Sequence, residues 1–160
     1  MEGTTMNPSA AYIKWVKGEQ EGYDWLDITN FLLIANAEIT DYNISEGEMN
    51  KIAEISERMF SVWCGEGVQF TTVDVKRKLQ LAFSWYEKVQ NVPEGQIDQA
   101  VMSHVKKLAT WLKQQDWFNE EFANSVISWM VELAEVDGVN ENEKGSTNSL
   151  AEFWGVKKPF

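Results

Sequence analysis

A short acidic pattern occurs twice in this chain, each time soon after a long apolar stretch with helical spacing. The first copy is Ile-Ser-Glu-Gly-Glu over residues 44–48, and the second is Val-Asn-Glu-Asn-Glu over residues 139–143. The apolar stretches before them end in Ala-Glu at residues 37–38 and 134–135. The copies lie about 95 residues apart, which exceeds the roughly 20 to 50 residues of solenoid repeats. The pattern therefore predicts a duplicated helix–corner–helix unit within one domain.

Apolar residues recur at intervals of three and four along most of the chain, and no β-hairpin signal interrupts them. The helix expected over residues 24–39 would turn one face inward, formed by Trp25, Ile28, Phe31, Leu32 and Ala35. The other helices are expected to begin at Asn7-Pro8, Ser45, Thr71 or Thr72, after the loop 91–95, at Asn119 and at Asn140.

The sequence thus predicts an all-α protein, a compact bundle of about seven helices with two pseudo-symmetric halves. One domain would cover residues 1–160, with a core over about 24–156 and a flexible tail at residues 1–7.

The formal charge of −11 excludes some partners and favours others. A field of this sign repels nucleic acid and anionic lipid, so we expect protein partners or cations instead. Cys64 is the single cysteine, which precludes an intramolecular disulfide and suits a reducing compartment. No apolar run reaches the roughly 18 residues of a membrane span, and residues 1–9 lack a secretory pattern. We expect a cytoplasmic protein that does not insert into membranes.

Helix capping explains part of the acidic pattern. Ser45 and Asn140 are good N-cap residues, and Glu48 and Glu143 follow each of them by three positions, as in a capping box. Acidic side chains in a first turn also complement the helix dipole. These two glutamates therefore require no further function.

Capping leaves the acids just upstream unexplained. Glu38, Asp41, Glu135 and Asp137 lie near the C-terminal end of a preceding helix, where negative charge opposes the dipole. Such carboxylates suit a hard divalent ion, so Ca²⁺ or Mg²⁺ is favoured over Zn²⁺. The EF-hand pattern does not fit, because Gly47 falls at loop position seven rather than six. A cation site assembled from the two corners and simple solvated caps both remain open.

Residues 133–144, with the sequence Leu-Ala-Glu-Val-Asp-Gly-Val-Asn-Glu-Asn-Glu-Lys, resemble the closing motif of TerB-like tellurite-resistance domains. Leu150-Ala151-Glu152 and Trp154-Gly155 extend the likeness, and over residues 24–156 the architecture is similar. The resemblance implies a seven-helix fold with pseudo-twofold halves. It also implies a cytoplasmic stress-response role linked to tellurite resistance.

The resemblance further implies that the acidic surface binds metal. The family's acidic positions fall on Asp137 and Glu143 and, in the first copy, on Asp41 and Glu48, with Glu38 and Glu135 as supporting ligands. The chain departs from the family at Tyr42, where the family often has glycine.

No motif for nucleophilic catalysis or phosphate binding occurs, so we expect a protein that is not an enzyme. A pure interaction module and, as a weaker alternative, a carboxylate-based enzyme remain open. The single histidine, His104, is interpreted as a structural residue. The basic run 75–78 is interpreted as a solvated helix face, and Trp117-Phe118 is a candidate for an exposed aromatic pair in a protein-binding surface.

Overall fold

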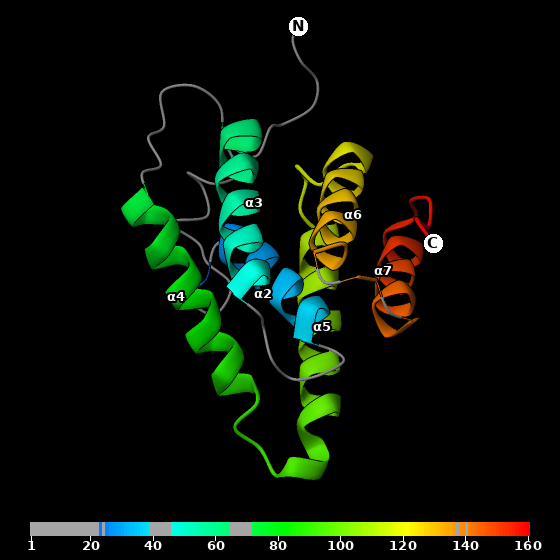
Figure 1. The fold of residues 1–160 in the computed structure, drawn as a ribbon. Helices are drawn as coiled ribbons and strands as arrows, with labels where there is room; N and C mark the ends of the chain where they lie inside the picture. The colour runs from blue at the N-terminus through cyan, green and yellow to red at the C-terminus, as the bar shows by residue number, and fades with distance from the viewer. Residues whose placement is uncertain (1–22, 24, 39–45, 65–71, 137, 140) are drawn as a thin grey trace, which may run out of the picture.

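Six α-helices make up most of the part of the chain that the structure describes (Figure 1). The computed structural model describes residues 23, 25–38, 46–64, 72–136, 138–139 and 141–160, and within them it has no β-strand. The helices are α2 (Trp25–Glu38), α3 (Glu46–Cys64), α4 (Thr72–Val89), α5 (Ile97–Lys113), α6 (Glu120–Ala134) and α7 (Glu141–Trp154), and the short 3-10 helix η1 (Glu94–Gln96) precedes α5. They form a compact all-α bundle, as predicted. The helix expected after Asn7-Pro8 lies outside the described residues.

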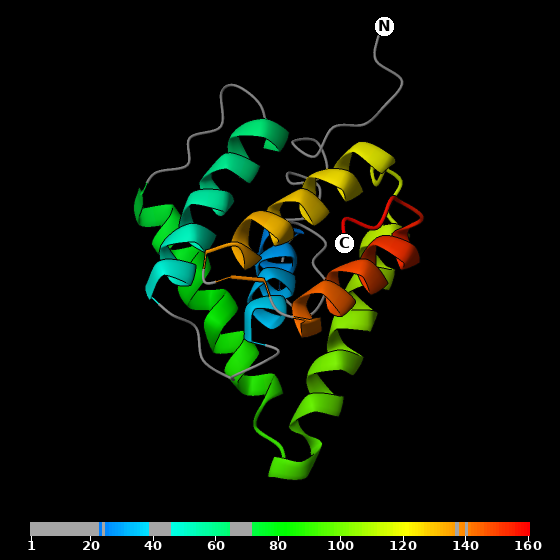
Figure 2. The same cartoon turned by 45° about the vertical axis from the view of Figure 1, so that its right-hand side comes forward.

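Helix α2 occupies the centre of the bundle (Figures 1 and 2). It packs against all five of the other described α-helices, and every residue from 25 to 37 is buried. The sequence pattern predicts a single inward face for this helix, and that prediction is too narrow. Residues between the predicted positions are buried too, because neighbouring helices cover every side of α2.

A helix buried on all sides must satisfy its polar side chains inside the protein. Ser56 of α3 donates a hydrogen bond from its hydroxyl to Asn30 Oδ1 over 2.6 Å. Thr29 donates to the backbone oxygen of Trp25, one turn earlier in the same helix, over 2.8 Å. These contacts hold α3 against α2 and keep the Thr29 hydroxyl bonded within the core.

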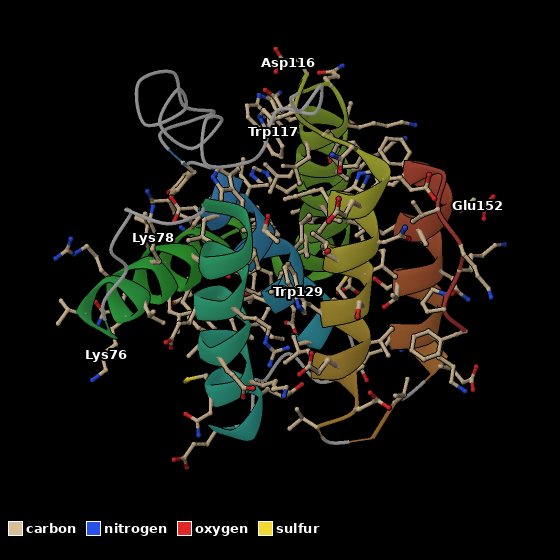
Figure 3. All side chains as sticks on the ribbon, turned by 90° about the horizontal axis from the view of Figure 1, so that it is seen from above. Lys76, Lys78, Asp116, Trp117, Trp129 and Glu152 are labelled. Carbon is tan, nitrogen blue, oxygen red and sulfur yellow. The ribbon has the colours of Figure 1, made fainter. Side chains whose placement is uncertain are left out.

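Asp27 is also buried in α2, and Lys78 of α4 reaches it. The Lys78 Nζ lies 3.3 Å from Asp27 Oδ2. The interpretation of residues 75–78 as a solvated face is therefore wrong at Lys78, while Lys76 is exposed and lies at the outer edge of the bundle (Figure 3). The contact joins residues 51 positions apart, so helical periodicity alone does not reveal it.

Aromatic side chains fill much of the remaining core. Trp117 packs edge-on against Trp25 and Phe122, with ring centroids 6.4 Å and 5.1 Å away. Its predicted exposure is therefore wrong, because the segment after α5 folds back over the start of α2 and α6. His104 lies 5.3 Å from Phe31, ring centroid to ring centroid, within a second aromatic group. That packing agrees with its interpretation as a structural residue.

Two helix ends follow the local sequence signals. The side chain of Asn119 accepts a hydrogen bond from the backbone N–H of Phe122 over 2.8 Å, as expected of an N-cap. Gly155 directly follows the last residue of α7, and its φ of 75° is the left-handed conformation that glycine adopts without strain. None of the described helices has both the length and the apolar character needed to cross a bilayer.

The Asp27–Lys78 contact can be tested by replacing the lysine. We expect Lys78→Met to lower the free energy of unfolding by about 2–3 kcal/mol, because it removes a cation from a buried carboxylate. The exposed neighbour provides the control: Lys76→Met should stay within about 0.5 kcal/mol of the parent protein. Urea unfolding of the three proteins measures both values. Equal effects of the two substitutions would contradict the assignment.

Candidate functional site

The two acidic first turns lie toward the same end of the bundle. Helices α2 and α6 run toward that end, and α3 and α7 start from it (Figures 1 and 2). Glu46 and Glu48 lie in the first turn of α3, and Glu141 and Glu143 lie in the first turn of α7. The described parts of both acidic corners therefore lie toward the same end of these four helices, which we call the acidic end.

Glu48 and Glu143 are buried rather than solvated. Their exposed fractions are 7% and 4%, and each residue has an interaction partner. Because a buried charge is costly unless it is paired or hydrogen-bonded, the two glutamates are structural members of the acidic end. Capping by Ser45 and Asn140 lies outside the described residues.

The burial pattern of α3 recurs in α7 at the spacing of the sequence repeat. In each helix the third residue is buried, and the buried residues that follow lie at the same intervals in α3 as in α7. The buried pairs are Glu48 with Glu143, Ile52 with Thr147, Ile55 with Leu150, Ser56 with Ala151, and Met59 with Trp154. The register that aligns the two caps therefore also aligns the two buried faces.

The other predicted ligands divide into two groups. Glu135 is exposed at the end of α6, where its backbone N–H donates to the oxygens of Val131 and Leu133. Asp41, Asp137 and the side chain of Glu38 lie outside the described residues. Within the described parts of the chain, no three His, Cys, Asp or Glu side chains are grouped as metal ligands would be. Since Ca²⁺ takes six to eight oxygens, the described carboxylates alone do not fit a cation site.

Glu132 of α6 forms ion pairs with two basic side chains of α3. Lys51 Nζ lies 2.8 Å from Glu132 Oε1, and Arg58 donates to Glu132 Oε2 over 2.8 Å. Arg58 also pairs with Glu54 of its own helix over 2.7 Å. The α6 carboxylate is therefore neutralised by two cations of α3 and joins these helices.

The electrostatics of this network follow from its hydrogen bonds. The hydrogen bond from Lys51, followed by that from Arg58, holds the pKa of Glu132 below its ordinary value. The same hydrogen bonds raise the pKa of Lys51 and of Arg58. The intrahelical pair of Glu54 and Arg58 is visible in the sequence as an i, i+4 spacing. The partner across the bundle is not visible, because it requires knowing that α3 packs on α6.

Comparison of the chain with models of known protein families, with curated proteins and with solved structures gave no match. The TerB-like resemblance therefore rests on the motif residues around Asp137 and Glu143.

The role of Glu132 predicts a pH-dependent stability. Glu132→Gln should lower the free energy of unfolding by about 0.5–1 kcal/mol at pH 7, as expected of a partly exposed ion-pair network. Because the folded pKa is depressed, this contribution is complete above about pH 4.3, the ordinary value for glutamate. It is lost as the pH falls through the folded pKa. Urea unfolding at pH 7 and pH 3 should show a larger difference from the parent protein at pH 7 than at pH 3.

Glu54→Gln is the matched control, because Glu54 is exposed and its contacts with Lys51 and Arg58 lie within α3. We expect a change below about 0.5 kcal/mol at either pH. A Glu132→Gln effect that is as large at pH 3 as at pH 7, or that Glu54→Gln reproduces at pH 7, would contradict the network's cross-helix role.

Proposed function

We propose that this protein is a non-enzymatic, TerB-like helical domain of the stress response linked to tellurite resistance, and that its acidic end binds a divalent cation. The recurrence of a buried glutamate at the same position of α3 and α7 is the observation that carries the proposal. It supports two halves, α2–α3 and α6–α7, derived from one duplicated unit. A duplicated unit with an acidic corner in each half is the arrangement that the TerB-like resemblance implies.

The proposed ligands come from both corners. Asp41 and Asp137 are the principal proposed ligands, and Glu48 and Glu143 complete the set. Glu38 and Glu135 support the site at the C-terminal ends of α2 and α6, where the helix dipole places further negative charge. Carboxylate oxygens favour Ca²⁺ or Mg²⁺ over Zn²⁺.

Calorimetric titration of the full chain with Ca²⁺ and Mg²⁺ tests this proposal. We expect a dissociation constant below 1 mM for one of the ions, and we expect Asp137→Asn to weaken it about tenfold, which corresponds to about 1.4 kcal/mol. Glu121→Gln is the control, because Glu121 is an exposed acid at the opposite end of α6, roughly 20 Å from its last turn at 1.5 Å per residue.

Two results would overturn cation binding. One is the absence of binding by either ion at 1 mM. The other is equal affinity of the Asp137→Asn and Glu121→Gln proteins, because the charge lost would then be the same and its position would not matter.

A second candidate function is a protein-interaction module, and exposed apolar side chains at the acidic end favour it. Met49 in the first turn of α3 and Val136 just after α6 are both exposed. Apolar side chains among like charges are typical of surfaces that bind proteins. The partner would present a basic surface with apolar residues, in keeping with the net charge of −11.

Affinity capture from cell extract separates this candidate from cation binding. A partner held by the acidic end should remain bound in EDTA. It should dissociate at about 0.5 M NaCl, because charges are then screened. It should also fail to bind the Val136→Asp protein. Val73→Asp, at an exposed apolar residue of α4, is the matched control and should retain the partner. Loss of the partner in EDTA, or an equal effect of both substitutions, would count against the module.

A carboxylate-based enzyme has the weakest support. Such a site requires two carboxylates in one cleft. The large cavity beside α5 and α7 includes one, Asp98, among its described lining residues.

A further inference from the structure

A cavity of about 620 Å³ lies between α5 and α7, with α2 beneath it. Its volume falls within the range of roughly 300–1,000 Å³ that is typical of small-molecule sites. The lining is mainly apolar and includes Leu32, Ala35, Val101, Val105, Leu150 and Phe153. The residues of the Glu132 network do not line it, whereas Asn142, in the first turn of α7 at the acidic end, does.

Contacts between α5 and α7 join the two helices that form the cavity walls. Trp154 Nε1 donates to the backbone oxygen of Ala109 over 3.1 Å. Lys113 Nζ donates to the backbone oxygen of Phe153 over 2.9 Å, and the same ammonium lies 4.9 Å from the centre of the Phe153 ring. The C-terminal halves of the two helices are thereby fixed to each other, so the walls of the cavity are formed in advance.

Asn36 of α2 provides an incomplete hydrogen-bonding group in the cavity wall. Its side chain is 4% exposed, and its Nδ2 donates to the Thr147 hydroxyl of α7 over 3.3 Å. Its Oδ1 is buried and has no hydrogen-bond partner within the described parts of the chain. A buried amide oxygen without a donor is unfavourable, so a ligand that brings a donor gains affinity there.

The mouth of the cavity indicates how the rest of the ligand is recognised. Met102 and Phe153 are 46% and 37% exposed, so large apolar surfaces stand at the opening. Asp98 and Lys106, both on α5, are the charged residues of the described lining, and their charges are opposite. The opening therefore carries no net charge that would select an ionic ligand.

We propose that this cavity binds a small, largely apolar molecule that carries one neutral hydroxyl group. The hydroxyl donates a hydrogen bond to Asn36 Oδ1, and the apolar body lies against Val101, Val105 and Leu150. A carboxylate offers no donor to Oδ1, and an ammonium group would lose its hydration beside apolar walls. A neutral hydroxyl group provides a hydrogen-bond donor and carries no charge that would have to be desolvated.

Two probes that differ in the hydroxyl hydrogen test the proposal on the full chain. We expect 2-naphthol to bind with a dissociation constant below 1 mM by ligand-observed NMR or equilibrium dialysis. We expect 2-methoxynaphthalene, which has the oxygen but no donor, to bind at least about tenfold more weakly. Asn36→Leu should remove this preference, so that the two probes bind with equal affinity.

Adjacent residues on α5 provide a matched pair of variants for the location of the site. Met102→Trp places a larger ring at the mouth and should weaken 2-naphthol about tenfold or more. Ser103→Trp adds the same ring at an exposed position outside the cavity lining and should leave the affinity unchanged. Both positions are exposed, so both variants are expected to fold, and thermal unfolding checks this.

Several results would overturn the proposal. These are no binding of 2-naphthol at 1 mM, equal affinity of the parent protein for both probes, an Asn36→Leu protein that keeps the preference, or equal effects of Met102→Trp and Ser103→Trp. The titration is repeated in EDTA and should not change, so its outcome is independent of the cation proposed at the acidic end.

Discussion

The structure depends on the complete burial of α2 and on the polar side chains that this helix carries into the core. A helix surrounded by other helices can bury apolar residues in any direction, so apolar contacts alone select its neighbours weakly. Its polar groups are more selective, because each requires a particular partner. Asp27 is met by Lys78 of α4, Asn30 by Ser56 of α3 and Asn36 by Thr147 of α7. These contacts assign three different helices to three positions along α2.

The same central helix brings the two candidate functional regions close together. The C-terminal part of α2 leads toward the acidic end and also provides Asn36 to the cavity wall. On α7, Glu143 is buried in the first turn, and Thr147, which binds Asn36, follows it by four residues, about one helical turn. The acidic end and the cavity thus share the contact between α2 and α7, although their proposed ligands differ in chemistry: a hard cation at one and a neutral apolar molecule at the other.

Local signals in the sequence predicted the helices well and several ends correctly. Asn119 caps α6 as its residue type and position indicate, and Gly155 ends α7 with a positive φ. The predictions that failed concern contacts between distant segments. Trp117 was predicted to face solvent, yet the chain folds it against Trp25 and Phe122. Lys78 belongs to a basic run, yet its position on α4 places it over buried Asp27.

By itself, the sequence determined the all-α class and most helix positions, because periodicity, caps and glycines act over a few residues. It also identified Glu48 and Glu143 as equivalent positions, but not as buried ones. Only the tertiary structure decided that α2 is enclosed on every side, that Glu132 is paired with Lys51 and Arg58, and that Asn36 faces a cavity. The physical reason is that burial, ion pairing and cavity shape depend on which helices pack together. In this protein, contacts between polar groups far apart in the sequence determine the packing. Local sequence patterns do not predict these contacts.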